Sequence, residues 1–450
     1  MYLSVLHKRY GELFTFTMPR WGRSIVIHRP EWLEHMRKYD GTIYGKGDVS
    51  LSIFKEFPGP VSAFGSEGQE WRMSRRVMRP IFITQSFDVD VSRAMSEIVP
   101  VAKELLMNAS MINQPIGFNN FYGRVAMVIF CKMALNYETD LITSNPACLF
   151  KPNTLVDSVL ALNSISSGRL YNPFWRFTEK FDRIGRDFDS HRKELYKIID
   201  HIVHTRKQDY TLHKSNEHHN DFLSTLLADD YAQDPEILRD TLVTLLFAGK
   251  DNVQNALSWS LHELSRSPVD WIGQMRAEAL SRDNLDGIIK YGDLEKFPVH
   301  MAVFYETLRL WPGVPKNARI ALKDDVIPSF PGSVHGPIRV AKGDYILWSD
   351  YAMMREEKVW GPEANVFNPG RHLNGEGKFV KPPSPKFHAF GAGSRACPGA
   401  QLAAYEFVAI WTGFLPFFDL VPLETKERYP CDAFTMSMND ELWVKVVPHK

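Results

Sequence analysis

Hydrophobic residues recur at steps of three and four through the middle of the chain, which predicts a largely helical protein. The segments FLSTLLADD and VDWIGQMRAEALSR both show this spacing. So does the run from Pro235 to Arg266, which is long and has no proline after its first residue. We therefore expect one long central helix over this run.

Short strand-like runs lie toward the two ends of the chain. LFTFTM and RWGRSIVIHRP, near the start, predict a small sheet with a helix packed on it. After Pro312, IRV, YILWS and the tail ELWVKV predict further short strands, and a last helix is expected from Pro398 to about Phe414. No linker marks an internal boundary. We expect residues 1–450 to form a single domain, mostly α with a minor β part.

Composition narrows the functional classes. The 53 basic and 53 acidic side chains balance, which argues against a nucleic-acid partner. The four cysteines show no paired spacing, so a disulfide framework or zinc site is not expected. No stretch reaches the roughly 18 apolar residues of a membrane span, and Lys8 and Arg9 interrupt the opening where a signal peptide is apolar. As written, the chain is expected to be soluble and monomeric.

The densest candidate chemistry lies in the segment FGAGSRACPG, residues 390–399. Its glycines allow tight turns close to a flat cofactor, and Pro398 suits the first turn of a helix. Cys397 is then expected at the positive end of a helix, which favours a thiolate. Arg395 can reach an acidic group of the cofactor, and Phe390 can shield the sulfur. A buried structural cysteine is the alternative, but the fixed offsets of these residues favour a metal ligand.

This segment resembles the F-x-x-G-x-R-x-C-x-G signature of the cytochrome P450 family of haem-thiolate monooxygenases. The helix after it carries Ala403 and Glu406, where the family has the same two residues. The resemblance implies a P450 fold with haem b buried between the central helix and the helix after the cysteine loop. It makes Cys397 the iron ligand, with cofactor contacts from Phe390, Gly391, Arg395 and Gly399.

Glu306 and Arg309, in ETLRLWP, are three residues apart and can pair on one helix face. An isolated pair of this kind is usually exposed to solvent and stabilises its helix only slightly. The segment resembles the family's E-x-x-R helix, however, and WGPEANVFNPGR resembles the stretch that supplies a second arginine, here Arg371. This resemblance implies a buried structural cluster. His372 stands where the family usually has an aromatic residue.

Trp71 and Arg75, in EWRMSRR, resemble the family's W-x-x-x-R, whose side chains hold the haem propionates. A surface-exposed basic helix face is the alternative, because other arginines crowd the same segment. By the same resemblance, Arg319 and Arg395 are expected as further propionate partners.

The central helix contains FAGKDNV, residues 247–253. Glycine inside a helix costs about 1 kcal/mol relative to alanine, so Gly249 needs a reason. Ala248, Gly249 and Asp251 resemble the family's A-G-x-D-T, which implies that the helix opens near the haem for oxygen and water. Asp251 is the candidate proton relay, unless it is merely a solvated residue. Asn252 replaces the usual threonine, and an amide is a poor proton carrier.

The resemblance implies insertion of one oxygen atom from O2 into an apolar substrate, with electrons from NADPH through NADPH–cytochrome P450 reductase. PGVPKNARIALKDDVIP and TMSMNDELWVKV look most like eukaryotic fatty-acid and alkane hydroxylases. Phe247, Val314 and Met436 are the expected pocket residues, which suit a lipid-like or terpenoid substrate. Two alternatives remain: a peroxide-dependent or hydroperoxide-rearranging enzyme, motivated by Asn252, and a haem-binding relative without activity.

Expectations about the surroundings of the enzyme come last. Lys378, Lys381 and Lys386 precede the cysteine loop, and we hypothesise that they dock an acidic electron donor. Ordinary solvated lysines are the alternative. Hydroxylases of this kind usually carry a membrane anchor before the catalytic domain. With such an anchor, the endoplasmic reticulum membrane, on its cytosolic face, is the expected location; the chain alone is expected to be cytosolic.

Overall fold

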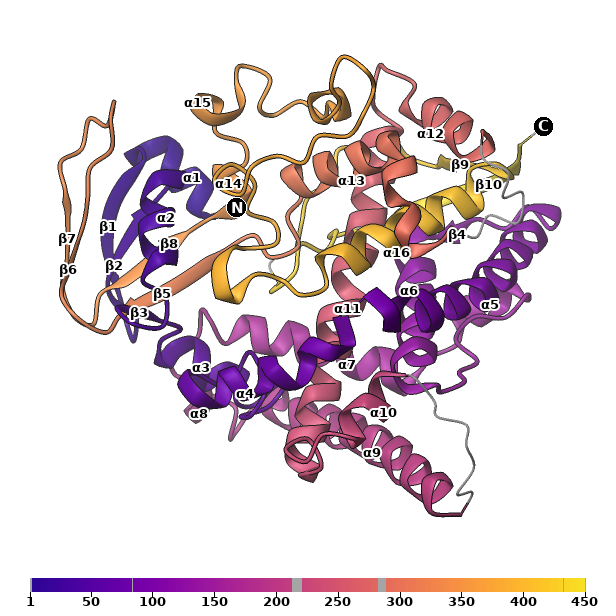
Figure 1. The fold of residues 1–450 in the computed structure, drawn as a ribbon, viewed down its shortest axis with the longest axis horizontal. Helices are drawn as coiled ribbons and strands as arrows, with labels where there is room; N and C mark the ends of the chain where they lie inside the picture. The colour runs from indigo at the N-terminus through magenta and orange to yellow at the C-terminus, as the bar shows by residue number, and fades with distance from the viewer. Residues whose placement is uncertain (1, 83, 213–220, 282–288, 432, 450) are drawn as a thin grey trace.

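The computed structural model describes residues 2–82, 84–212, 221–281, 289–431 and 433–449. Helices fill most of the molecule, and the largest sheet lies at one side of them (Figure 1). The expectation of a mostly helical fold with a minor β part is confirmed.

The described α-helices are α1 (Tyr2–Tyr10), α2 (Pro30–Lys38), α3 (Asp48–Phe54), α4 (Gly68–Met78), α5 (Thr84–Met111), α6 (Phe118–Leu135), α7 (Thr154–Gly168), α8 (Trp175–Thr178), α9 (Arg183–Leu212), α10 (Phe222–Leu227), α11 (Pro235–Leu264), α12 (Trp271–Leu280), α13 (Pro298–Leu310), α14 (Asp350–Met353), α15 (Glu357–Trp360) and α16 (Ala400–Phe414). Short 3-10 turns are η1 (Arg79–Phe82), η2 (Pro146–Phe150), η3 (Tyr291–Lys296), η4 (Pro369–His372) and η5 (Gly393–Arg395).

The strands form three sheets. The largest has the order β1-β2-β8-β5-β3, with β2 and β8 parallel and its other pairs antiparallel. The smaller sheets have the orders β4-β10-β9 and β6-β7. Their bounds are β1 (Leu13–Met18), β2 (Gly22–Ile27), β3 (Tyr44–Gly45), β4 (Ile116–Gly117), β5 (Asn317–Ala321), β6 (Asp325–Ile327), β7 (Ile338–Val340), β8 (Tyr345–Trp348), β9 (Phe418–Pro422) and β10 (Trp443–Pro448). The predicted strands IRV, YILWS and the tail are confirmed as β7, β8 and β10.

The central helix is α11, and it ends two residues before the predicted Arg266. It begins at Pro235, whose missing N–H costs nothing at this position. The Asp234 side chain caps it by accepting hydrogen bonds from the N–H groups of Glu236 and Ile237. Residues on all faces of α11 are buried, because α6, α9, α13 and α16 pack around it.

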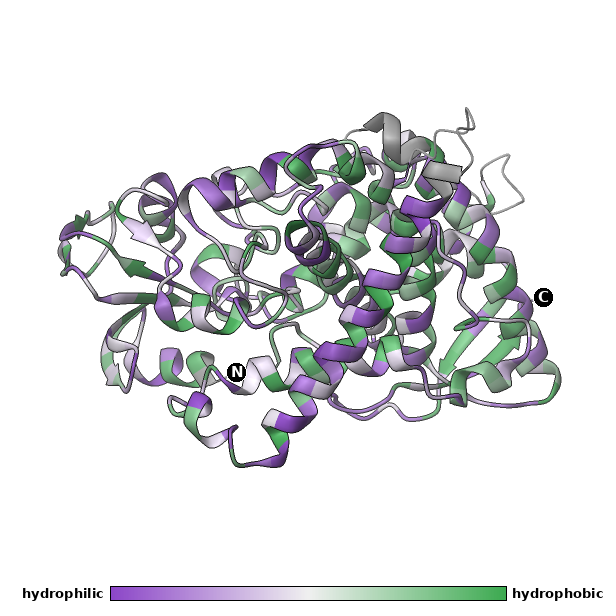
Figure 2. Cartoon of the chain, turned by 90° about the horizontal axis from the view of Figure 1, so that it is seen from below, coloured by the Kyte–Doolittle hydropathy of each residue, from purple (hydrophilic) through white to green (hydrophobic). Residues whose placement is uncertain are grey.

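Most helices share one hydrophobic core, and two smaller clusters flank the five-stranded sheet. Hydrophobic and hydrophilic residues alternate along many helices, whereas the strands beside the C-terminus are mostly hydrophobic (Figure 2). Burial of apolar surface in the main core fixes α16 against α11, and the Trp411 indole N–H donates to the Ser260 hydroxyl between them at 3.2 Å.

The last helix and the cysteines can be compared with the sequence-based expectations. The last helix starts at Ala400, two residues later than the predicted Pro398, and Gly399 is its N-cap. Cys131, Cys148 and Cys397 are free thiols in the part of the chain that the structure describes. Among the helices that the structure describes, none combines the length and the apolar character that crossing a bilayer requires.

Candidate functional site

The cysteine loop makes the tight turns that its glycines allow. Gly391 and Gly393 have φ angles of 64° and 67°, a left-handed conformation that side chains with a Cβ rarely adopt. The Gly391 N–H donates to the His388 carbonyl at 2.8 Å, and the Cys397 N–H donates to the Phe390 carbonyl at 2.8 Å. This folding of the loop fixes the backbone at Cys397. The Phe390 ring itself packs near Phe304, with ring centroids 6.2 Å apart, and no described contact places it over the sulfur.

Solvent can reach the Cys397 side chain, although many protein atoms surround its sulfur. Burial raises the pKa of the Cys397 thiol, although the Gly399 N–H and the Arg75 charge act in the opposite direction. The Gly399 N–H before α16 favours the thiolate, but burial has the larger effect on the pKa of the thiol. A bound cation would supply the missing stabilisation.

Helix α4 brings Trp71 and Arg75 to this loop. The Arg75 guanidinium donates to the Ala396 carbonyl at 2.8 Å, next to the cysteine. The Arg395 guanidinium lies over the Trp71 ring, 4.4 Å from its centroid. The other arginines of the α4 segment are exposed, so α4 has one face on the loop and a separate basic face in solvent.

Arg395 and Arg319 meet at one carboxylate. Asp40 pairs with Arg395 at 2.9 Å and with Arg319 at 3.4 Å, while Glu67 lies 3.3 Å from Arg395. Burial lowers the pKa of Arg395, and the Arg319 charge contributes to the same shift. One nitrogen of Arg395, Nη1, is buried without a hydrogen-bond partner among the described residues. With Arg75 nearby, this cluster offers more donors than its acids use, which fits the two carboxylates of haem b.

Asp251 on α11 is buried rather than solvated. One of its carboxylate oxygens accepts from the Asn163 amide of α7 at 2.7 Å, and the other pairs with the Lys250 ammonium at 2.6 Å. Lys250 is itself 1% exposed. Neither Lys250 nor Asn163 was a candidate: Lys250 is the chain neighbour of Asp251 on α11, whereas Asn163 reaches it from α7, far away in the sequence.

Asn252 turns its amide back onto its own helix. Its Nδ2 donates to the Ala248 carbonyl at 3.0 Å, while Oδ1 is buried without a partner among the described residues. That oxygen lies so close to Gly313 that a Cβ there would overlap it. The helix is continuous from Ala248 to Asn252, so the expected opening is not present as a break in α11. A Cβ at Gly249 would lie 3.3 Å from the Phe130 ring of α6, so a larger residue here would require that ring to shift slightly.

The three expected pocket residues lie in different surroundings. Phe247 is buried, with its ring 5.4 Å from that of Phe57. Met436 is 2% exposed, and its backbone N–H donates a hydrogen bond to the Gly313 carbonyl at 3.0 Å. Val314 is 42% exposed. Phe247 and Met436 thus belong to the main core, and the pocket assignment of all three stays a prediction.

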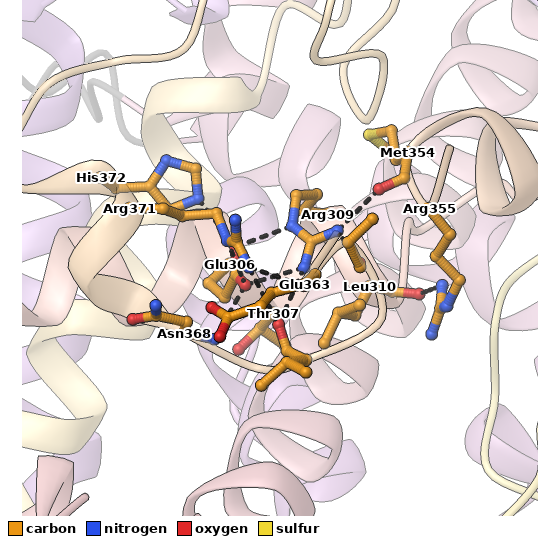
Figure 3. A network of polar contacts seen from close by, with 12 residues as sticks. Glu306, Thr307, Arg309, Leu310, Met354, Arg355, Glu363, Asn368, Arg371 and His372 are labelled. Atoms are coloured by element: carbon orange, nitrogen blue, oxygen red, sulfur yellow. Dashed lines mark hydrogen bonds and ion pairs between the residues drawn. The ribbon is translucent and has the colours of Figure 1, made fainter. Parts of the chain in front are cut away.

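Figure 3 shows the cluster around Glu306, whose carboxylate is fully buried. Arg309 donates to both Glu306 oxygens at 2.8 Å, and Arg371 donates at 3.0 Å. His372 also reaches Glu306, at 3.0 Å. Burial would raise the pKa of Glu306, but the hydrogen bonds from Arg309 and His372 outweigh it and lower the pKa to about 2. His372 therefore belongs to the cluster, and its place directly after Arg371 was the available signal.

Comparisons with known proteins agree with this geometry. The family model described as "Cytochrome P450" matches residues 1–444. "Cytochrome P450 monooxygenase cyp1" of Mycosarcoma maydis is 31% identical over 426 residues, which cover 92% of this chain and 65% of that protein. "Cytochrome P450 94A2" of Vicia sativa is 26% identical over 98% of this chain and 83% of its own length. "Cytochrome P450 52A10" of Candida maltosa is 32% identical over 54% of this chain and 47% of its own length. The chain therefore belongs to the cytochrome P450 family of haem-thiolate monooxygenases.

Proposed function

We propose that this chain is one catalytic domain that inserts an oxygen atom from O2 into an apolar, lipid-like or terpenoid substrate. NADPH, through NADPH–cytochrome P450 reductase, supplies the two electrons. The observation that carries the proposal is the convergence of Arg75, Arg319 and Arg395 beside the loop that presents Cys397. A thiol with a set of cations beside its loop suits the iron and the carboxylates of one haem b.

Each residue group has a defined task in this proposal. Haem, when bound, supplies the oxygen-activating chemistry, and Cys397 holds its iron. Arg75, Arg319 and Arg395 bind the propionates, and the Trp71 ring supports the Arg395 guanidinium. The remaining cofactor contacts are proposed for Ala248, Gly249, Phe390, Gly391 and Gly399.

Proton supply is assigned to Asp251 and Asn252. Lys250 and Asn163 each hold one oxygen of the Asp251 carboxylate, so a proton must enter at a remaining lone pair or displace one of these partners. One N–H of the Asn252 amide is used on the Ala248 carbonyl; the other can donate toward the substrate side, but an amide is a poor proton carrier. Both features predict slow proton delivery and loss of reducing equivalents as peroxide.

Asn252→Thr tests this assignment. A threonine hydroxyl can accept and donate a proton at the same site, so the variant is expected to form several-fold less hydrogen peroxide per NADPH consumed. Asn252→Ala, which removes the amide, is the comparison and is expected to form more peroxide than the natural protein. Peroxide yield and product yield per NADPH are the measurements. Equal yields in all three proteins would contradict a role for residue 252 in proton supply.

The substrate class is tested with fatty acids, alkanes and terpenes. An apolar molecule that displaces water from the iron shifts the Soret absorption band of the haem, so a titration gives the dissociation constant directly. The proposal expects a saturable shift with at least one of these classes, followed by its NADPH-dependent hydroxylation. Phe247, Val314 and Met436 are the proposed contacts. No shift with any apolar compound would contradict the proposed substrate class.

A second candidate function is favoured by Asn252 alone. A hydroperoxide-rearranging haem enzyme needs no threonine-based proton relay and no reductase. Turnover of a lipid hydroperoxide without NADPH, together with no NADPH-dependent product, would select this alternative.

The electron donor is proposed to dock on Lys378, Lys381 and Lys386. All three are exposed, and only Lys378 has a described ion pair, with Glu376 at 2.9 Å. Reversing the three charges to glutamate is expected to raise the apparent KM for the reductase roughly tenfold at low salt, since charge complementarity mainly affects encounter. An unchanged KM would contradict the docking site. The matched control reverses three exposed lysines elsewhere: Lys193, Lys197 and Lys323.

Location follows from the same proposal. For a full-length protein that carries a membrane anchor, we propose the cytosolic face of the endoplasmic reticulum, where the reductase partner is found in this family.

A further inference from the structure

The segment of residues 57–66 joins α3 to α4 without regular secondary structure, yet two charged side chains hold its backbone. One is Lys46, from the loop before α3. The other is Asp240, from the central helix α11. Lys46 precedes the segment in the sequence and holds its second half. Asp240 follows the segment in the sequence and holds its first half.

Lys46 uses all three of its ammonium donors on this segment. Its Nζ donates to the carbonyls of Ala63, Phe64 and Ser66 at 2.6, 3.0 and 2.7 Å. Burial lowers the pKa of Lys46 to about 7, and the Arg395 charge contributes. An ammonium group has three N–H bonds, so these carbonyls satisfy it completely. Three backbone carbonyls of the loop are thereby fixed to one atom.

Asp240 holds the other half. Its side chain is fully buried on α11, and the Val61 N–H donates to its carboxylate at 3.2 Å. Gly59 packs against the same carboxylate with a φ angle of 144°, and a Cβ at this position would overlap it. Only glycine allows this approach. The loop is therefore seated on the helix at Gly59 and Val61.

The fixed segment carries aromatic rings toward Phe247, the residue before Ala248 and Gly249. The Phe57 and Phe64 rings lie 5.4 and 6.1 Å from the Phe247 ring. Phe434 lies 6.4 Å from Phe247 on another side. Phe54 completes the group, 5.6 Å from Phe64 and 5.0 Å from Phe434. Phe54, Phe64 and Phe434 are only partly buried, so part of their aromatic surface stays available.

We propose that Lys46 and Asp240 are positioning residues that fix Phe64 beside Phe247 and Phe434, and that these three rings form the wall that selects the apolar part of the substrate. This inference rests on the proposed function. Aromatic faces give apolar groups large contact areas with little entropy cost, and a loop that is already rigid need not be ordered on binding. The motif residues alone do not identify either positioning residue.

Lys46→Met tests the inference in the haem-loaded protein, since methionine keeps most of the stem and removes the three donors. Two haem ligands serve as probes, imidazole and 4-phenylimidazole, which bind iron alike but differ by one apolar ring. We expect Lys46→Met to raise the dissociation constant of 4-phenylimidazole about tenfold, as measured by Soret titration. The dissociation constant of imidazole should stay unchanged. Hydrogen exchange of the amides of residues 61–66 is expected to become about tenfold faster. Lys55→Met, at an exposed lysine nearby, should change neither.

Phe64→Ala is the second variant and removes the ring without touching the clamp. It should weaken the binding of 4-phenylimidazole but not that of imidazole. The amide hydrogen exchange of residues 61–66 should stay slow. Unchanged amide exchange of residues 61–66 in Lys46→Met would contradict the positioning role of Lys46. An equal loss of affinity for both imidazoles in Phe64→Ala would contradict the proposal that Phe64 belongs to the substrate wall. A natural protein that binds no haem would contradict the proposed function instead, so the two failures are distinguishable.

Discussion

Cys397→Ser is expected to abolish the red-shifted Soret band that carbon monoxide gives with reduced haem-thiolate proteins. Serine keeps the size of the side chain but offers no thiolate, so iron loses its electron-donating ligand. NADPH-dependent oxygenation should fall below detection, a loss of at least about a thousandfold in rate, equivalent to about 4 kcal/mol. Difference spectra and product assays on the purified protein are the measurements.

The control for this variant is Cys431→Ser, at a partly buried cysteine outside the loop. It should retain both the spectrum and the activity. If Cys397→Ser kept an unchanged spectrum and rate, the iron would have another ligand, and the proposed site would be wrong.

Glu306→Gln is expected to destabilise the fold by about 3–5 kcal/mol, because it leaves the buried Arg309 charge without its anionic partner. The amide can still occupy the space, but it cannot accept from Arg309, Arg371 and His372 together. Urea unfolding of the haem-loaded protein, followed by Soret absorption and by circular dichroism, measures the loss. Glu363→Gln is the matched control, since its side chain is exposed and only its backbone carbonyl accepts from Arg371.

The effect of pH on this variant has a defined sign. The pKa of Glu306 is lowered to about 2 in the folded protein. Its contribution is therefore complete above the ordinary glutamate pKa and is lost as the pH falls toward 2. The stability difference between Glu306→Gln and the natural protein should narrow over that range. A constant difference at every pH would indicate that the charge of Glu306 is not the cause.

Local sequence pattern was enough to predict the elements that depend on local physics. The helical period, uninterrupted by proline, predicted α11 to within two residues, and the positive φ angles of Gly391 and Gly393 match the turns expected from glycine. The start of α16 was placed too early because proline tolerates a helix start but does not require one.

The partners of the candidate residues could not be predicted in this way. Asp251 was the candidate proton relay, but its partner Asn163 on α7 lies far away in sequence and reaches it only in the folded protein. The position of Cys397 before a helix predicted an influence that favours the thiolate, whereas the burial that raises the pKa of this thiol follows only from the folded protein. Such effects depend on which surfaces come together, and one sequence does not encode them locally.

Strand β2 pairs in parallel with β8, and Ser24 lies beside Tyr345 in that register. During synthesis the first hairpin leaves the ribosome long before its neighbour has been translated. Chains emerge at about 5–20 residues per second, so β1 and β2 wait for tens of seconds with one open strand edge. Exposed edges of this kind promote aggregation, and slower translation or a chaperone that covers the nascent hairpin should therefore affect yield in a heterologous host.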